Sequence, residues 1–292
     1  MSLIMILAPM ALLGFISALF LWMRLESRRY QINSHAATVA KPLPSPLRIL
    51  HLSDTHFRGE ERALGILFET LGRDVYDFIF ITGDIFDCPA GISGAALFQK
   101  LNSRHGIYAV FGNHDYFNYG YMDLVLHYTP GQGKPYAPQP TERFEKAVRE
   151  AGVRLLRNET VEVSLGGTPI LIHGLDDPTT GRANVRQAML NFDPAKLNIL
   201  LTHSIDVFLD IGDNEVDLSF SGHSHGGQVC FPLIGPVLTH TLLGRQYAKG
   251  IHLLKGATCS ISRGLGTSRF YPFRLLCAPE AIVLEIAGSS LK

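Results

Sequence analysis

Five short motifs rich in aspartate, histidine and asparagine are spread along the sequence, and each follows a short apolar run. They are Asp54-Thr55-His56, Gly83-Asp84-Ile85-Phe86-Asp87, Gly112-Asn113-His114-Asp115, Thr202-His203 and Gly222-His223-Ser224-His225. Together they offer carboxylate and amide oxygens and imidazole nitrogens without a thiolate. This donor set suits Mn²⁺, Fe or Zn²⁺ better than Ca²⁺ or Cu(I). The motifs therefore predict a site that binds divalent metal ions.

Two of the motifs place their metal-ligand candidates two residues apart, as Asp54 with His56 and His223 with His225. In an extended backbone such side chains lie on one side, so we expect each pair to converge on metal. Glycines beside the motifs allow tight turns. A lone histidine is more often a structural residue than a metal ligand. All five motifs in this order, however, strongly indicate a metal site.

The apolar runs before the motifs predict the elements that position them. Buried strands are expected at residues 47–52, 78–81, 107–111 and 197–201, and helices at 61–74 and 94–104. This βαβαβ start favours a partly parallel sheet with the site at the carboxyl ends of its strands. Later segments predict a second sheet, with a hairpin of 160–165 and 169–174 and strands at 216–222 and 281–286.

The motifs in this order resemble the calcineurin-like metallophosphoesterase family over residues 47–286. The resemblance implies an α/β domain at 47–288, built as a four-layer α-β-β-α sandwich of two mixed sheets. It also implies two divalent metal ions, Mn²⁺ in preference to Fe or Zn²⁺, and in-line attack on phosphorus by a hydroxide that bridges them. One metal ion is expected on Asp54, His56, Asp84 and His225, and the other on Asp84, Asn113, His203 and His223, with Asp84 shared.

Residues beside the ligands have roles implied by the same resemblance. His114 matches the family's histidine that protonates the leaving oxygen or stabilises phosphoryl charge, and Asp115 is expected to orient it. Asp87 and Ser221 are expected to support the ligands without binding metal. The remaining histidines are expected to be ordinary core or surface residues: His51, His105, His173, His240 and His252.

The N-terminal segment 3–23 carries no charged side chain and, at about 1.5 Å per residue, is long enough to span a bilayer core of about 30 Å. We expect a transmembrane anchor there and a linker at 24–46. A cleaved signal peptide is disfavoured because no basic stretch precedes the apolar run. Arg24, Arg28 and Arg29 follow it, so the positive-inside rule places the domain on the cytoplasmic side of the inner membrane.

The overall composition excludes some partners. The chain has 26 basic and 26 acidic residues, so no net charge attracts a nucleic-acid polymer, and none is expected as a partner. The cysteines form no CxxC pair and are expected to be free thiols in a reducing compartment: Cys88, Cys230, Cys259 and Cys277.

Further stretches of the sequence make the family resemblance more specific. They are Gly226-Gly227-Gln228, Gly174-Leu175-Asp176-Asp177 with Gly181-Arg182, and the segment 262–268. They are similar to a branch of membrane-associated bacterial phosphodiesterases that includes the UDP-2,3-diacylglucosamine pyrophosphatases of lipid A synthesis. The resemblance implies a phosphodiester or pyrophosphate substrate that is linked to lipid. A soluble nucleotide or phosphoprotein substrate remains an alternative, as does a membrane-tethered scaffold.

A long aromatic segment, 116–141, directly follows the third motif. It is interpreted as an active-site lid, as an insertion that only packs on the domain, or as a surface for a partner protein. Its candidate substrate contacts are Tyr116, Phe117 and Tyr121. Arg58 and Arg263 are candidates for binding a phosphate, with simple surface solvation as the alternative for each.

Overall fold

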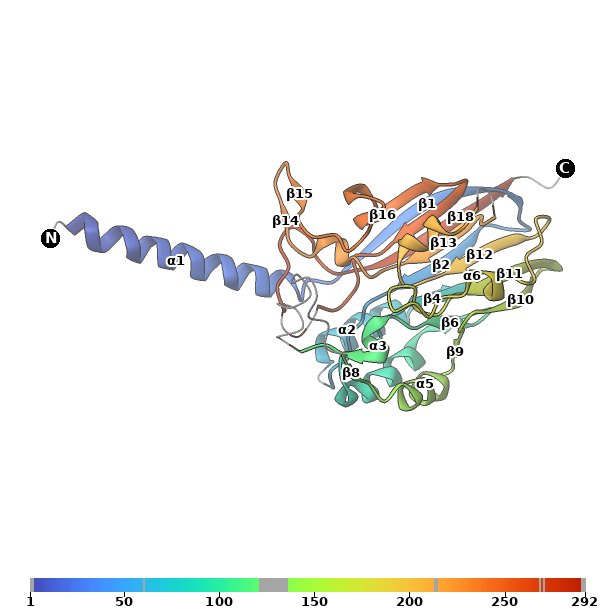
Figure 1. Ribbon diagram of the computed structural model, residues 1–292, viewed down its shortest axis with the longest axis horizontal. Helices are drawn as coiled ribbons and strands as arrows, with labels where there is room; N and C mark the ends of the chain where they lie inside the picture. The colour runs from blue at the N-terminus through green and yellow to red at the C-terminus, as the bar shows by residue number, and fades with distance from the viewer. Residues whose placement is uncertain are drawn as a thin grey trace.

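A long N-terminal helix leads into two stacked β-sheets in the computed structural model (Figure 1). The structure describes residues 3–59, 61–120, 136–212, 215–267, 269 and 271–289. The helices are α1 (Leu3–Glu26), α2 (Arg62–Leu71), η1 (Pro89–Lys100), α3 (Asn113–Tyr116), α5 (Thr141–Glu150), α6 (Val185–Ala188), η2 (Ile205–Leu209), η3 (His225–Gly227) and η4 (Arg245–Ala248), where η marks a 3₁₀-helix.

Both large sheets mix parallel and antiparallel neighbours. The first contains, in spatial order, β1 (Gln31–Pro42), β18 (Glu280–Ser289), β2 (Leu47–Leu52), β4 (Phe78–Thr82), β6 (Ile107–Val110) and β9 (Val153–Leu155). The second contains β10 (Glu159–Leu165), β11 (Thr168–Gly174), β12 (Leu197–Leu201), β13 (Leu218–Ser221), β17 (Ala257–Ile261) and β16 (Gly250–Leu254). Short pairs join β3 (Val75–Tyr76) to β5 (Asn102–Ser103), β7 (Phe117–Asn118) to β8 (Ala137–Pro138), and β14 (Cys230–Phe231) to β15 (Gly235–Pro236).

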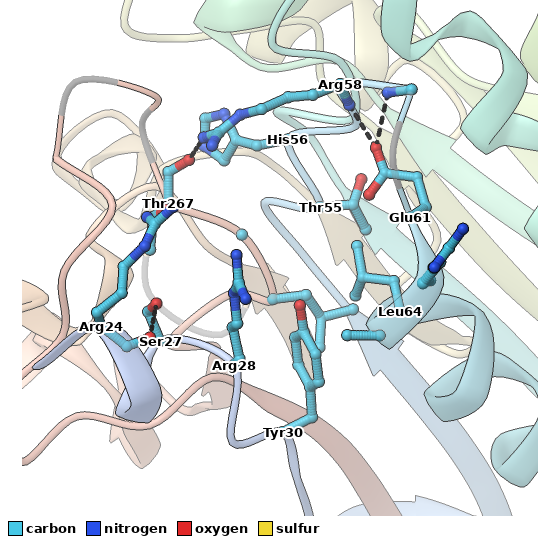
Figure 2. Close-up of a pocket in the computed structure, with 15 residues that line it drawn as sticks. Arg24, Ser27, Arg28, Tyr30, Thr55, His56, Arg58, Glu61, Leu64 and Thr267 are labelled. Carbon is cyan, nitrogen blue, oxygen red and sulfur yellow. Dashed lines mark hydrogen bonds between the residues drawn. The ribbon is translucent and has the colours of Figure 1, made fainter. Parts of the chain in front are cut away.

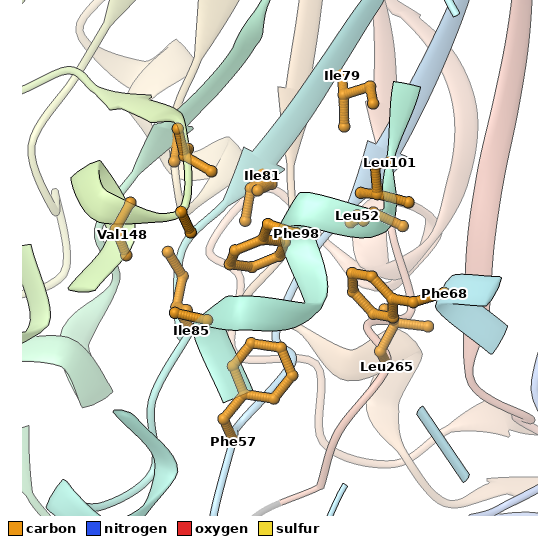
Figure 3. Packing of buried hydrophobic residues seen from close by; sticks show 14 of the residues in the cluster. Leu52, Phe57, Phe68, Ile79, Ile81, Ile85, Phe98, Leu101, Val148 and Leu265 are labelled. Atoms are coloured by element: carbon orange, nitrogen blue, oxygen red, sulfur yellow. The ribbon is translucent and has the colours of Figure 1, made fainter. Parts of the chain in front are cut away.

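Alternation along the strands divides the core into layers. In β2, Ile49 faces the second sheet, where it joins the cluster of Ile172 and Phe220 between the sheets. Leu50 belongs to a different cluster, on the other face of the first sheet. Figure 3 shows part of that cluster, with Phe68 of α2, Phe98 of η1 and Val148 of α5. A third cluster lies under η2 and α6 on the outer face of the second sheet. The α-β-β-α order implied by the family resemblance is thus confirmed.

Most of the predicted strands are present. The runs at 47–52, 78–81, 107–111 and 197–201 form β2, β4, β6 and β12, and the hairpin forms β10 and β11. The predicted helix at 61–74 is the shorter α2. The helix predicted at 94–104 is confirmed only in part, because the helix found there, η1, is a 3₁₀-helix that begins at Pro89 and ends at Lys100. Its glycines, Gly91 and Gly94, lie directly against Phe57, where any larger side chain would collide.

The linker expected at 24–46 is also wrong, because most of it is strand β1. β1 pairs in parallel with β18 from Gln31 onward, and Val39 and Leu43 are buried in the core between the sheets. β1 lies at the edge of its sheet, so most of its side chains are exposed and no apolar run marks it in the sequence. Most of the segment after α1 is therefore part of the domain.

The helix α1 is mostly exposed from Leu7 onward and is attached to the domain at its C-terminal end. By length and composition it is a candidate membrane span, Leu7–Glu26. The loop 271–277 holds its last turn: Cys277 N donates to the Glu26 carboxylate at 2.8 Å, and Arg274 N donates to Met23 O at 3.1 Å. The Phe20 ring also lies 5.4 Å from that of Phe273. These contacts fix where α1 ends relative to the domain.

Two truncations test the contribution of β1. Removal of residues 1–29 leaves β1 in place, whereas removal of residues 1–46 deletes it together with Val39 and Leu43. A buried aliphatic side chain contributes roughly 1.5–3 kcal/mol. We therefore expect the shorter protein to melt roughly 5–20 °C below the longer one. Thermal unfolding followed by circular dichroism measures this difference, and equal melting temperatures would contradict a structural role for β1.

Candidate metal centre

The seven predicted metal ligands come together at the carboxyl ends of five strands, where the two sheets meet. Asp54 and His56 follow β2, Asp84 follows β4, and Asn113 follows β6. From the second sheet, His203 follows β12, and His223 and His225 follow β13. A hydrogen bond of 2.8 Å between His203 Nδ1 and Thr82 O ties the two strand ends together. The site thus needs both sheets.

Four of these residues form a first cluster of donor atoms. Single ligand atoms of Asp54, His56, Asp84 and His225 all lie within 4.8 Å of one another. The Nε2 atoms of His56 and His225 are 3.2 Å apart, and His225 Nε2 is 3.5 Å from Asp54 Oδ1. Two ligands on one Zn²⁺ or similar ion, each at about 2.0–2.1 Å, stand roughly 3.0–3.4 Å apart. The cluster therefore fits a divalent metal ion.

The second cluster lies on the other side of Asp84. His203 Nε2 is 3.2 Å from Asn113 Oδ1, 3.2 Å from His223 Nδ1 and 3.3 Å from Asp84 Oδ1. The other carboxylate oxygen, Asp84 Oδ2, faces His56 Nε2 at 3.6 Å. The two oxygens of one buried carboxylate thus face two separate donor groups, as a ligand shared by two metal ions must.

Hydrogen bonding selects a form of His203 that suits metal binding. Its Nδ1 can only donate to the Thr82 carbonyl, because a carbonyl oxygen has no proton to give. In the neutral ring this leaves the lone pair on Nε2, which faces Asp84 and Asn113. Burial lowers the pKa of His203, but the carboxylates of Asp84 and Asp54 outweigh it and raise the pKa overall. A raised pKa favours the doubly protonated ring, so a metal ion that binds Nε2 would have to displace the proton from that nitrogen.

The backbone at the ligands is not extended, which corrects the reason expected for their convergence. Asp54, His56 and Asp84 have φ of 49°, 45° and 49°, and His223 and His225 have 68° and 49°. Residues other than glycine rarely adopt this left-handed region, and each costs of order 1–3 kcal/mol. The side chains therefore converge because the chain turns sharply after each strand, and the surrounding packing must hold that strain.

Two glycines let the ligands approach the backbone closely. A side-chain carbon at Gly112 would overlap the Asp84 carboxylate, and one at Gly222 would overlap Asp54 and Ser53. The glycines of these motifs are thus needed for space as well as for turning.

His114 is held beside the centre, but by a different carboxylate from the one expected. Its backbone N–H donates to Asp84 Oδ1 at 2.8 Å, and its Nδ1 lies 3.3 Å from Asp87 Oδ1. Burial lowers the pKa of His114, but Asp84 and Asp87 outweigh it and raise the pKa. Asp87 Oδ1 also lies 3.4 Å from His56 Nδ1. Asp87 Oδ1 therefore lies between the ring of one candidate ligand and that of the candidate catalytic histidine.

The orienting role expected of Asp115 is wrong. Its carboxylate instead accepts backbone N–H groups of Ile85, Phe86 and Gly112 at 2.9–3.2 Å. Burial, together with the charge of Asp84, raises the pKa of Asp115 to about 7. Asp115 therefore holds the loop after β4 in place and does not orient the neighbouring His114 ring.

The structure places one of the predicted substrate contacts at the centre and others away from it. Arg58 lies at the centre, with its Nε 3.1 Å from Asp87 Oδ2. Arg263 does not point there as a phosphate ligand, because its Nη2 is paired with Glu280 at 2.6 Å. Tyr116 is buried with its hydroxyl donating to Asp176, and Phe117 packs on Tyr136. Tyr121 and most of the expected lid, residues 121–135, lie outside the described residues.

The other predicted residues take mostly structural places. His51 bridges the sheets through Ser260 and Thr82, at 3.0 and 2.9 Å, and burial lowers its pKa to about 3. His173 is buried against Thr160 and Asn198. His240 is the exception, since its ring lies 6.0 Å from that of His223. The four cysteines are free thiols as expected, with Cys230, Cys259 and Cys277 buried and Cys88 partly exposed.

Three residues near the centre were not predicted. Arg274 is fully buried, and its Nη2 lies 3.4 Å from His225 Nδ1. Tyr119 packs its ring 4.7 Å from that of His114. Arg24, at the end of α1, lines the same cavity as His56. Tyr119 belongs to the aromatic segment 116–141 and Arg24 to the basic residues after the apolar run, whereas no motif surrounds Arg274.

With this geometry in view, the chain belongs to the calcineurin-like phosphoesterase family, which residues 47–227 match. It is therefore a hydrolase of phosphoric esters. It is 31% identical to the uncharacterized metallophosphoesterase YkoQ of Bacillus subtilis, over 89% of this chain and 92% of that one. It is 25% identical to the UDP-2,3-diacylglucosamine pyrophosphatase LpxG of Chlamydia muridarum, over 82% of this chain and 83% of that one.

A solved structure is also similar to the chain. It is the phosphopantetheinyl hydrolase PptH of Mycobacterium tuberculosis, which is 12% identical with a TM-score of 0.41 and matches 75% of this chain and 88% of that one.

Substitution of Gly222 tests the need for space at the centre. In Gly222→Ala the added methyl group overlaps the Asp54 carboxylate, so we expect metal affinity to fall about tenfold or more. Gly65→Ala is the matched control, because Gly65 lies in α2 with its nearest outside atom at 4.0 Å. Metal titration by calorimetry measures both variants. Unchanged affinity in Gly222→Ala would contradict the close packing described for this site.

Asp87→Asn tests the carboxylate shared by two histidines. The substitution keeps the shape of the side chain but removes the charge that holds His56 and His114. We expect kcat on an aryl phosphodiester to fall about 10- to 100-fold. Asp74→Asn is the control, because Asp74 is exposed and paired only with Arg48. Equal kcat values for the two variants would contradict a role for the Asp87 charge in catalysis.

Proposed function

We propose that the protein hydrolyses a phosphodiester or pyrophosphate bond in a lipid-linked substrate, with two Mn²⁺ ions as cofactors. The observation that carries the two-metal part is the shared carboxylate, since Asp84 Oδ1 faces His203 at 3.3 Å and Oδ2 faces His56 at 3.6 Å. When bound, two divalent cations supply a water of lowered pKa and neutralise the charge of the phosphoryl group.

The side chains around the centre supply the remaining chemistry. Hydrolysis forms a bond from water oxygen to phosphorus and breaks the bond to the leaving oxygen, which must gain a proton. His114 is the proposed donor, because Asp87 accepts at its Nδ1 and leaves Nε2 to exchange that proton. Its backbone N–H holds Asp84, so the proton donor and the shared ligand are placed by one short helix, α3.

The identity of the substrate is proposed by analogy. Relatives named UDP-2,3-diacylglucosamine pyrophosphatase span most of this chain at 25–26% identity. Such a substrate carries a diphosphate and acyl chains, so it needs both a metal centre and access to a membrane. UDP-2,3-diacylglucosamine is accordingly our proposed substrate.

We also propose that α1 anchors the protein in the inner membrane, with the domain on the cytoplasmic side. Large apolar side chains of α1 such as Met10, Leu13 and Phe15 are exposed. At the end of the domain from which α1 projects, the β14–β15 hairpin exposes Leu233 and Ile234 (Figure 1). The basic residues that follow the span support the cytoplasmic side.

Asp84→Ala tests the two-metal proposal. Loss of the shared ligand should remove both ions and reduce hydrolysis of an aryl phosphodiester to background. Metal content after desalting, measured by mass spectrometry, should fall from about two ions to below one per chain. A variant that keeps two ions and full activity would rule out the shared ligand.

Direct assay tests the substrate. The full-length protein, purified in neutral detergent and loaded with Mn²⁺, should release UMP from UDP-2,3-diacylglucosamine. An aryl phosphodiester is assayed in parallel to report that the metal centre is active. Turnover of the aryl diester without release of UMP would reject UDP-2,3-diacylglucosamine as the substrate, while phosphodiesterase activity would remain supported.

A further inference from the structure

A cavity of about 770 Å³ lies between the end of α1 and the start of α2, directly beside the metal centre (Figure 2). Thr55 and His56 form part of its wall, and the imidazole of His56, a candidate metal ligand, is buried behind that wall. Its opposite wall comes from the residues after the anchor, including Arg28 and Tyr30. The cavity thus lies between the end of α1 and a residue of the metal centre.

The wall of this cavity is strongly basic. Among the described residues, four arginines line it, Arg24, Arg28, Arg58 and Arg62, against one acidic residue, Glu61. The whole chain is balanced at 26 basic and 26 acidic residues, so this excess is local. The Glu61 carboxylate is already engaged, because it accepts the backbone N–H groups of Arg58 and Gly59. We name the cavity the arginine pocket.

Two of the four guanidinium groups are available to a ligand. Among the described residues, the side chains of Arg28 and Arg62 have neither a hydrogen bond nor an ion pair, whereas Arg58 is paired with Asp87. Figure 2 shows Arg28 extending into the pocket from the segment after α1. Arg62 is the first residue of α2, whose N-terminal dipole adds to the positive potential. Among the described residues, the positive charges that line the pocket outnumber the negative ones, and such an excess favours an anionic ligand.

The position of the pocket is held by the fold. The loop 271–277 fixes the last turn of α1 through Glu26 and Met23, and Arg24 Nη1 donates to Pro272 O at 3.2 Å. Downstream, β1 is paired with β18 from Gln31. Arg28 therefore stands on a short connection that is fixed at both ends, beside the metal centre.

We propose that the arginine pocket binds a second anionic group of the substrate, a phosphate next to the phosphoryl group that is hydrolysed. The inference rests on the proposed function and extends it, because it makes diphosphate esters the preferred substrates over simple phosphodiesters. It also gives the arginines after the anchor a role in binding substrate as well as in orienting the helix. The pocket accepts the phosphate whether the ester carries acyl chains or is soluble in water.

Neighbouring arginines provide the test. Arg28→Gln removes a charge from the pocket, whereas Arg29→Gln removes one from the next residue, which is exposed and does not line it. Full-length metal-loaded protein in neutral detergent is assayed on a diphosphate ester with acyl chains, one without them, and an aryl phosphodiester. We expect Arg28→Gln to lower kcat/KM about tenfold on the diphosphate esters, mainly through KM, and to leave the aryl diester within about twofold.

The control should leave all three substrates within about twofold of the wild type. Equal losses on diphosphate and aryl esters in Arg28→Gln, or equal effects of the two substitutions, would overturn the proposal. Loss on the acylated ester alone would assign the effect to the lipid and also overturn it. Arg62→Gln serves as a second variant if the melting temperature shows that Arg28→Gln is unstable.

A binding measurement separates this inference from the proposed function. A diphosphate ester with a methylene bridge resists hydrolysis, and its affinity for the metal-loaded chain is measured by calorimetry. Arg28→Gln should weaken binding about tenfold and reduce its dependence on salt, while Arg29→Gln should not. If the protein hydrolyses no phosphoester, the proposed function fails. A weaker affinity in Arg28→Gln than in Arg29→Gln would still support binding of a phosphate in the arginine pocket. Identical affinities in the two variants would reject it.

Discussion

The site depends on the burial of one shared carboxylate between two groups of histidines. Asp84 is nearly inaccessible to water, and a charge so placed is costly unless cations face it. Burial raises its pKa, but His203, His114 and His56 outweigh that effect and hold the pKa well below its usual range. Residues of both sheets therefore have to meet at this carboxylate, which explains why the site lies where the sheets join.

The strands supply the rigidity that this arrangement needs. Five of the seven candidate ligands have left-handed backbone, and such strain persists only where the surrounding packing determines it. The inter-sheet cluster, with Ile49, Phe80 and Phe220 fully buried, provides that packing directly behind the strand ends. Asp115 adds to it by binding three backbone N–H groups of the ligand loops.

The N-terminal region connects the site to the end of the molecule from which α1 projects. The edge strand β1 joins the sheet, and the loop 271–277 fixes the end of α1, so the arginines that follow the helix have defined positions. Arg274 of the same loop reaches His225, which links this attachment to a candidate metal ligand. A substrate held at the membrane surface would meet the arginine pocket and the metal centre together.

The sequence by itself determined the ligand candidates, the strands before them and the layered fold. It could do so because donor type, short apolar runs and glycines are local properties, and each motif stands at the end of its own strand. What only the tertiary structure decided depends on distances between segments far apart in the chain. Asp87 rather than Asp115 faces His114, and Arg263 meets Glu280 rather than a phosphate. Likewise, strand β1 is recognisable only from its pairing with β18, and the arginine pocket only from the way α1 is attached to the domain. Both depend on contacts between distant segments, and such contacts leave no pattern in the local sequence.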